Sequence, residues 1–477
     1  MKKTGTLINI DWITVFLYTL LVVIGISFIY DTTYSPVDPS FFKFNTSYGR
    51  QAVWFILSII IASIILIFDS RFYTSFAYII FGIVMLLLVG VLLFGVTIKG
   101  SKSWFRFGSI AFQPAELAKF ATILALAKFI SGYNIDLSKF KYQLQAIAIL
   151  LLPIILILKQ GDVGSMLVFS SLIFLLHREG LQSSYLVIGF SLIFFSIMSL
   201  LYNPFIIITA YSAILILFEY YKKQDEYPIF RILYWIIFIV GINYLNTTYL
   251  VPLINPENLN PYFPISLLLL LIFVVGYFFY RIKKKWLDFV LLAFIGVCIY
   301  TFSVDYLFNN ILKQHHRNRI DIILGKIHDP SNLGYNLEQS KIAIGSGGFL
   351  GKGYLKGTQT MLNYVPEQST DFIFTSIAEE LGFIGSFLLI SIYVMFLLRL
   401  LFLAERQRSQ FSRIYGYGVV SIFFIHFFIN IAMTIGFAPV IGIPLPFLSY
   451  GGSSLLSFTI LLFVFIRLDT QRMLILR

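Results

Sequence analysis

The sequence is poor in charged residues and has almost no cysteine. Only 12% of its 477 residues are Asp, Glu, Lys or Arg, whereas a typical soluble domain carries roughly 25%. Its one cysteine, Cys298, cannot form a disulfide within the chain or build a metal site from several thiolates. These scarcities exclude an ordinary soluble domain, an internal disulfide and a thiolate metal centre.

Hydrophobic residues are abundant instead, and they come in long blocks. They make up 58% of the chain, and the mean hydropathy is +0.86. Many blocks have roughly the 18 to 25 residues that a helix needs to cross a bilayer, where backbone groups must bond internally. The sequence therefore predicts an all-α, polytopic integral membrane protein with about fourteen spans. The predicted spans are 13–30, 51–68, 73–96, 113–130, 142–158, 163–177, 184–202, 204–221, 228–246, 264–280, 287–308, 371–399, 415–436 and 451–468.

Lys and Arg residues are distributed unevenly between the two sets of loops. With the N-terminus placed inside, basic residues collect in the inner loops, and the outer loops around 203, 247–262 and 437–450 hold none. This positive-inside pattern predicts that both termini are cytoplasmic. The net charge of +12 is therefore an orientation signal, and it does not indicate a nucleic-acid partner.

Two outer loops break this pattern. Residues 97–112 carry Lys99, Lys102 and Arg106, and residues 309–370 carry seven further basic side chains. An anionic ligand on the outer face would explain them, and so would attraction to lipid headgroups. The second loop is long and rich in glycine, aromatic and charged residues, which indicates an ordered, functional segment.

This long outer loop contains a glycine-rich stretch followed by a carboxylate. Six glycines lie between residues 345 and 357, together with Lys352 and Lys356. Such a stretch can cradle phosphates with its lysines, and it can equally be a flexible turn. Asp371 follows where the loop enters a long apolar block. It is either a helix cap, a role that Thr370 could equally fill, or a general base at the membrane edge.

Five more charged residues lie within or at the edge of predicted spans. Glu116 and Lys119 are three residues apart, share a helix face and can pair, which lowers the cost of two charges in a bilayer. That pair is either purely structural or lines a cavity. We expect Glu379 and Glu380 to face the bundle interior in structural roles. Asp162 is a cap or a structural carboxylate, with catalysis as the weaker alternative.

Five segments together resemble the SEDS family, the RodA/FtsW group of peptidoglycan polymerases. They occur in the family's order across nearly the whole chain, and the glycine-rich stretch is closer to the RodA branch. The segments are Arg50-Gln51, Gly100-Ser-Lys-Ser-Trp104 with Gln113-Pro-Ala-Glu-Leu-Ala-Lys119, Gln160-Gly-Asp-Val-Gly164, the run 343–374 and Pro444-Leu-Pro-Phe-Leu-Ser-Tyr-Gly-Gly-Ser-Ser454. Two positions depart from the family: Gly161 replaces a proline, and Ser369, to which we assign no role, stands where a histidine is common.

The resemblance implies a core of ten spanning helices, to which this sequence adds about four. The family has one helix between the helix that begins at the Gln160–Gly164 segment and the long outer loop, where this sequence has five, and an even insertion keeps that loop outside. The implied divisions are an N-terminal half of the core over 1–202, inserted helices over 203–281, a helix leading to the loop over 282–308, the outer loop over 309–370 and C-terminal core helices over 371–477.

The resemblance also implies glycosyl transfer in a bacterial inner membrane. Lipid II would be polymerised into glycan strands at the outer face, for cell-wall elongation and rod shape. Asp371 matches the family's essential aspartate, and we expect it to take the proton of the acceptor sugar's 4-hydroxyl. The pyrophosphate leaving group needs positive charge. The candidate cations are Arg50, Lys102, Arg106, Lys119, Lys352 and Lys356. No cofactor is firmly implied, although a divalent cation, magnesium or manganese, could share this task.

The family further implies partners. These are a class B penicillin-binding protein, which supplies transpeptidase activity, and the proteins of the elongation complex. Two other functions remain open. A lipid II flippase would need alternating access and charges along a central path, and a non-catalytic scaffold would only anchor its partners. Charge and glycine are instead concentrated in one outer loop, which favours chemistry at that face.

Overall fold

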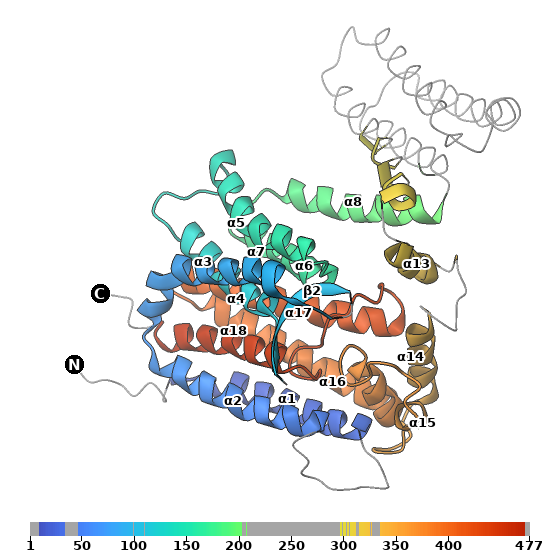
Figure 1. The fold of residues 1–477 in the computed structure, drawn as a ribbon. Helices are drawn as coiled ribbons and strands as arrows, with labels where there is room; N and C mark the ends of the chain where they lie inside the picture. Colours follow the sequence, from blue (N-terminus) through green and yellow to red (C-terminus); the bar gives the residue numbers. More distant parts are fainter. Residues whose placement is uncertain are drawn as a thin grey trace, which may run out of the picture. The chain divides into compact units, whose positions relative to one another are not determined.

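Long apolar helices form the framework of the protein (Figure 1). The computed structural model describes residues 9–33, 46–98, 100–108, 110–202 and 334–472, together with scattered residues between 207 and 326. Eight of the described helices are long and apolar enough to cross a membrane, which confirms the predicted polytopic, all-α class. They are α1 (Trp12–Thr33), α2 (Ser47–Ile67), α3 (Ser70–Phe94), α5 (Phe140–Lys159), α8 (Ser183–Leu201), α16 (Ile373–Glu405), α17 (Gln410–Ile435) and α18 (Gly452–Thr470).

Two predicted spans take a shorter form. α4 (Pro114–Ile130) has 17 residues. The expected span over 163–177 consists of two helices, α6 (Val163–Ser170) and α7 (Leu172–Arg178), which meet at Ser171. The Ser171 hydroxyl donates to a carbonyl three residues earlier, and such local bonds compete with regular helix.

The predicted insertion lies outside the described residues. The spans expected at 204–221, 228–246 and 264–280 belong to it, and about half of the next expected span, 287–308, also lies outside the described residues. The fourteen-span count and the division of the chain at 203 and 281 therefore stay predictions.

A small antiparallel sheet follows α3, within the segment that we expected to be an outer loop. β1 (Val96–Ile98), β2 (Ser101–Phe107) and β3 (Ile110–Phe112) pair in that order. Strands this short give little periodic signal in a sequence, which is why the sheet was not predicted.

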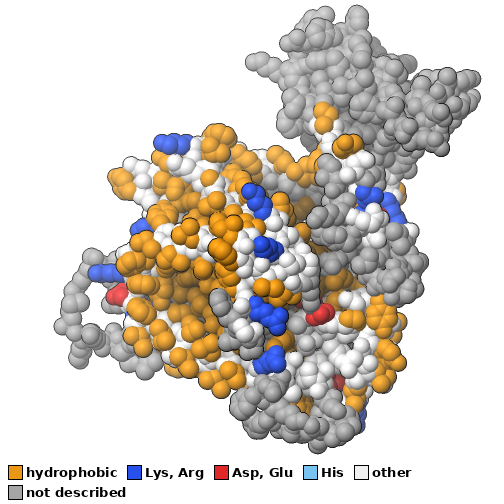
Figure 2. Space-filling view, in the orientation of Figure 1, with side chains coloured by type: hydrophobic (Ala, Val, Ile, Leu, Met, Phe, Trp, Pro, Cys, Tyr) orange, Lys and Arg blue, Asp and Glu red, His pale blue; other side chains and the backbone are white. Residues whose placement is uncertain are grey.

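α18 lies at the centre of the bundle. It packs against α2, α4 and α17, and most of its residues are buried. In Figure 1 it runs between α2 and α17. The peripheral helices instead expose large apolar side chains such as Ile56, Leu86 and Leu144. Figure 2 shows the broad hydrophobic surface that results, as expected for contact with lipid tails.

α16 is broken at Gly382, which corrects the expectation of one continuous helix over 371–399. Gly382 has a φ of 66°, a left-handed conformation that favours glycine. The glycine-rich loop supplies backbone bonds at the break, because Gly353 N donates to Glu380 O and Phe383 N donates to Gly348 O, both at 2.9 Å. The loop itself lies between two short helices, α14 (Tyr335–Ser346) and α15 (Thr358–Met361).

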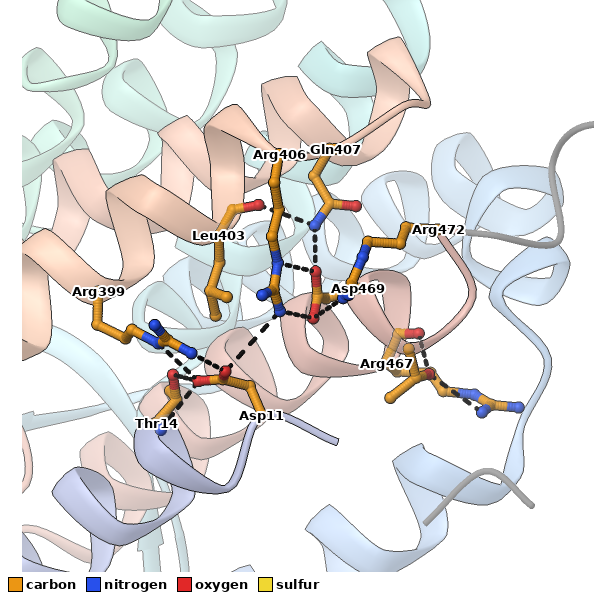
Figure 3. Close-up of polar contacts among 10 residues, drawn as sticks. Asp11, Thr14, Arg399, Leu403, Arg406, Gln407, Arg467, Asp469 and Arg472 are labelled. Carbon is orange, nitrogen blue, oxygen red and sulfur yellow. Dashed lines mark hydrogen bonds and ion pairs between the residues drawn. The ribbon is translucent and has the colours of Figure 1, made fainter. Parts of the chain in front are cut away.

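An ion-pair network joins three helix ends at the other end of α16 (Figure 3). Arg399 pairs with Asp11, which precedes α1, and Arg406 lies 3.8 Å from the same carboxylate. Arg406 also bonds Asp469 at the end of α18. Burial alone raises the pKa of Asp11, but hydrogen bonds from Arg399 and Thr14 outweigh it and hold that pKa below its ordinary value.

The chain divides into two compact units, Met1–Leu186 with His328–Arg477, and Val187–Ile327. Within the second unit, Ser196 Oγ and Tyr300 OH lie 2.7 Å apart. A π-helix, η3 (Leu307–Ile311), and α13 (Gln314–Ile323) follow. The candidate site described below lies wholly in the first unit.

Candidate active site

Several predicted motifs meet on the segment that joins α17 to α18, residues 436–451, which we name the α17–α18 connection. Asp371 lies beside Gly442 of this segment, where an added Cβ would be 3.3 Å from Asp371 Oδ2. Gly164, from the Gln160–Gly164 motif, approaches so closely that its Cβ would lie 2.9 Å from Ile441 O. Motifs about 280 and 70 residues away from the connection therefore converge on it.

The start of α2 contacts the same connection. Gln51 Nε2 donates to Ser449 O at 3.4 Å, and Gly451 N donates to Gln51 Oε1 at 3.2 Å. These bonds fix the first turn of α2, where the neighbouring Arg50 side chain is exposed. The structure thus brings Arg50, Asp162 and Asp371 to elements that share one connecting segment.

Asp371 is half-buried, and a side chain of α17 donates a hydrogen bond to its backbone carbonyl. Asn430 Nδ2 donates to the carbonyl oxygens of Asp371 and Ile443, both at 2.8 Å. α16 begins at Ile373 without any side-chain cap. The interpretation of Asp371 or Thr370 as a helix cap is therefore wrong, because the helix starts beyond both residues.

Glu116 and Lys119 form a buried ion pair that reaches the same connection through α17. Lys119 Nζ lies 2.9 Å from both carboxylate oxygens of Glu116 and 3.0 Å from His426 Nε2. His426 Nδ1 is 3.1 Å from Pro444 O. Because a carbonyl only accepts, Nδ1 carries the ring proton and Nε2 accepts from the Lys119 ammonium. The contact between Glu116 and Lys119 was predictable from their spacing, whereas His426 was not predicted.

Asp162 caps α6. Its carboxylate accepts hydrogen bonds from Ser165 N at 2.9 Å and Ser165 Oγ at 2.8 Å, and from Gln113 Nε2 at 2.7 Å. Gln113 immediately precedes α4, so the three bonds tie the first turn of α6 to the start of α4. The geometry gives Asp162 a structural role.

The candidate cations differ in what they contact. Lys102 Nζ donates to Leu92 O at 2.9 Å, at the C-terminal end of α3, and Lys352 Nζ lies 2.7 Å from Glu379. Arg50, Arg106 and Lys356 are exposed. Figure 2 shows Lys and Arg side chains gathered beside the hydrophobic surface. The exposed cations are the ones available to an incoming anion.

Glu379 and Glu380 have different surroundings, although both are buried. Glu379 accepts from Lys352 and from backbone and hydroxyl donors of residues 358–360, so it anchors the first turn of α15. Glu380 Oε1 accepts from Gly357 N at 3.2 Å, and no described residue bonds its Oε2. The glycine-rich loop is therefore packed against α16, and its role in holding a phosphate stays a prediction.

Three further polar residues at this end of the molecule were not predicted. His426 and Asn430 are one turn apart on α17, and Asp31 is buried near the end of α1. Each interrupts a long apolar block, and a polar residue in such a block usually faces the bundle interior. That signal was present in the sequence, but it does not identify the partner.

Comparisons with known proteins agree with this architecture. A family model described as "Cell cycle protein", covering FtsW, RodA and SpoVE, matches residues 11–218 and 214–474. The peptidoglycan glycosyltransferase RodA of Treponema pallidum is 29% identical over 449 residues, 94% of this chain and 94% of that protein. The peptidoglycan glycosyltransferase MrdB of Escherichia coli is 42% identical over 162 residues, 34% of this chain and 44% of that protein.

A solved structure shares the fold. It comes from a peptidoglycan synthase complex that coordinates polymerization and crosslinking, and it superposes with a TM-score of 0.61 at 23% identity. The match covers 97% of this chain and 98% of the other. Because the family model spans almost the whole sequence, this chain is a member of the FtsW/RodA/SpoVE family.

Proposed function

We propose that this protein is a peptidoglycan glycosyltransferase that polymerises lipid II into glycan strands for cell-wall elongation and rod shape. The observation that carries the proposal is the half-buried Asp371, held beside Gly442 with its backbone fixed by Asn430. A positioned carboxylate can act as a general base for a sugar hydroxyl. Family membership supplies the substrate class, since named relatives are peptidoglycan glycosyltransferases.

The proposed step is a direct displacement. Asp371 takes the proton from the 4-hydroxyl of the acceptor GlcNAc as that oxygen bonds to C1 of the donor MurNAc. The bond from C1 to the pyrophosphate oxygen breaks, and undecaprenyl pyrophosphate leaves with the electron pair. One base and a good leaving group give inversion at C1.

The charge that develops on the pyrophosphate needs cations more than it needs a proton donor. We assign this role first to Arg50, Arg106 and Lys356, whose side chains are exposed. Lys102 and Lys352 would first have to leave the α3 carbonyl and Glu379. Lys119, buried against Glu116 and His426, supports the connection beside Asp371 and is not placed for direct contact.

A divalent cation near Asp371 stays a prediction. In the described part of the chain, no group of three or more His, Cys, Asp or Glu side chains is arranged to hold a metal. The residues around Asp371 therefore do not form a complete metal site, and the proposed step uses none.

We further propose the cellular setting. The protein lies in the bacterial inner membrane with both termini in the cytoplasm, which puts the long loop and Asp371 on the outer face where lipid II is used. A class B penicillin-binding protein would crosslink the product, alongside other elongation-complex proteins. The fold shared with a complex that joins polymerization to crosslinking supports such a partner.

Product formation from lipid II tests the proposal. The purified full-length protein, with a class B penicillin-binding protein of its own species, is given labelled lipid II, and the products are separated on a gel. A ladder of glycan strands supports polymerisation. Lipid II that remains monomeric but crosses the bilayer of proteoliposomes would instead indicate a flippase, and neither change would indicate a scaffold.

A further inference from the structure

Asp31 and Glu380 form a buried acidic pair between α1 and α16. Asp31 is 1% exposed and Glu380 is fully buried, and the two carboxyl groups are within hydrogen-bonding reach of each other. Among the described residues, neither oxygen of Asp31 nor Glu380 Oε2 has a hydrogen-bond donor. Two ionised carboxylates accept but cannot donate, so this contact satisfies neither of them.

No cation among the described residues pairs with Asp31 or Glu380. The third acid nearby, Glu379, is paired with Lys352 at 2.7 Å and accepts bonds on both of its oxygens. When both groups are ionised, Asp31 and Glu380 carry two negative charges, and an uncompensated buried charge is costly. A divalent cation would neutralise both.

A neutral side chain that bonds the residue after Asp31 also has an oxygen without a donor. Gln368 is 6% exposed, and its Nε2 donates to Thr32 O at 3.2 Å and Thr360 O at 3.1 Å, so it bridges the end of α1 and α15. Its Oε1 accepts no hydrogen bond from any residue that the structure describes. Because Nε2 contacts carbonyl oxygens, the amide orientation is fixed and Oε1 is the orphan atom. Hard cations are bound by such carboxylate and amide oxygens.

We propose that Asp31 and Glu380 bind a divalent hard cation, magnesium or calcium, with Gln368 Oε1 as a neutral ligand. Adjacent carboxylates with unused oxygens provide the oxygen-rich environment that these ions require. Glu379 is excluded as a ligand because Lys352 and the α15 donors occupy it. This site is separate from Asp371 and from the proposed glycosyl transfer. Its role is structural, since it would link α1 to α16 beside the loop that leads to Asp371.

Thermal unfolding of the full-length protein tests the site without any assay of polymerisation. The purified protein is treated with EDTA, dialysed and titrated with MgCl₂ or CaCl₂ while its Tm is followed. Because a ligand that binds only the folded state stabilises it, we expect a saturable rise of several degrees for at least one cation. Asp31→Asn should abolish the rise. In EDTA this variant should melt above the wild type, because the repulsion is removed.

Asp136→Asn is the matched control. Asp136 lies in an exposed loop far along the sequence from Asp31, so this variant should keep the wild-type cation response. A Tm that ignores both cations, or the same rise in Asp31→Asn, would overturn the proposal. A Tm that ignores cations but falls as the pH is raised would show that the pair shares a proton instead, which also overturns it.

Direct binding decides the question if Asp31→Asn does not fold. MnCl₂ is titrated into the wild-type protein and into Glu380→Gln, and free Mn²⁺ is measured by electron paramagnetic resonance. One bound ion per chain that MgCl₂ or CaCl₂ displaces, and that Glu380→Gln lacks, supports the site. Equal binding by the two proteins, or no binding by either, contradicts it.

Discussion

Lys119 and His426 are 307 residues apart in the sequence, yet Nζ and Nε2 lie 3.0 Å apart in the buried centre of the bundle. His426 also contacts the α17–α18 connection, because its other ring nitrogen, Nδ1, faces Pro444 O. Asn430, one turn further along α17, holds the backbone of Asp371. α17 therefore connects a buried ion pair to the carboxylate that we place at the reaction centre.

Two substitutions of His426 should distinguish the contribution of its packing from that of its hydrogen bond to Lys119. His426→Phe removes the acceptor for a buried Lys119 N–H, and an unsatisfied buried donor of this kind costs about 1–3 kcal/mol. His426→Gln can still accept that bond. We expect thermal unfolding and lipid II polymerisation to be impaired more by His426→Phe than by His426→Gln. Equal effects of the two substitutions would show that the ring acts through its volume alone.

Removing Lys119 should leave Glu116 buried without a partner. Breaking one side of a buried ion pair costs about 3–5 kcal/mol, whereas removing both sides is often nearly neutral. Lys119→Met should therefore lower the Tm strongly, and the double variant Lys119→Met/Glu116→Gln should recover most of it. Activity recovered together with stability would show a purely structural pair. Activity still absent in the stable double variant would show that the charges serve the reaction.

The break in α16 predicts which glycines cannot be replaced. A Cβ at Gly382 would lie 2.2 Å from Gly351 N, and the positive φ adds strain of about 1–2 kcal/mol. Gly382→Ala should therefore lower the Tm and displace the loop from α16. Gly345→Ala is the control from the same glycine-rich stretch, because an added Cβ there meets nothing within 4 Å. Equal Tm values for both variants would contradict the packing role.

The network at the other end of α16 should respond to acid. The folded-state pKa of Asp11 is held below its ordinary value, so its contribution is complete above about pH 4 and is lost as the pH falls through the folded-state pKa. Asp11→Asn should cost about 1–2 kcal/mol at neutral pH. The Tm difference from wild type, measured between pH 7 and pH 3, should shrink toward the acid end.

A surface pair provides the comparison for that experiment. Arg178 and Glu405 also pair, at 3.2 Å, but both are about half exposed. Exposed pairs contribute about 0–1 kcal/mol, so Glu405→Gln should change the Tm little at any pH. A larger effect for Glu405→Gln than for Asp11→Asn would contradict the assignment of the network.

Local sequence spacing predicted the local parts of this structure. The pairing of Glu116 with Lys119 follows from a separation of three residues on one helix, and the apolar blocks gave the long helices. Contacts between distant segments were out of reach. Glycine is needed at position 382 because the backbone of Gly351 lies against it, and Lys119 contacts His426. Both contacts form only when distant segments pack together in the folded protein. The spacing of hydrophobic residues along the sequence does not indicate these long-range contacts.

The roles of the cations show the same limit. Lys102 and Lys352 occur in the expected motifs, but the structure turns their amines toward Leu92 O and Glu379. A sequence gives the charge of a side chain and not its direction. Asp31 illustrates the converse, since a lone acid near the end of an apolar helix gave no hint of Glu380 as its neighbour.

The most direct test of the central claim is the rate of glycan synthesis by Asp371→Asn. The variant and the wild type are purified with the same penicillin-binding partner, and their Tm values are measured to establish that both are folded. Both are then given labelled lipid II, and the products are compared on a gel. We predict a loss of about 10²-fold or more in polymerisation with the Tm unchanged, as expected for removal of a general base. A folded Asp371→Asn protein that makes glycan strands at the wild-type rate would contradict the account.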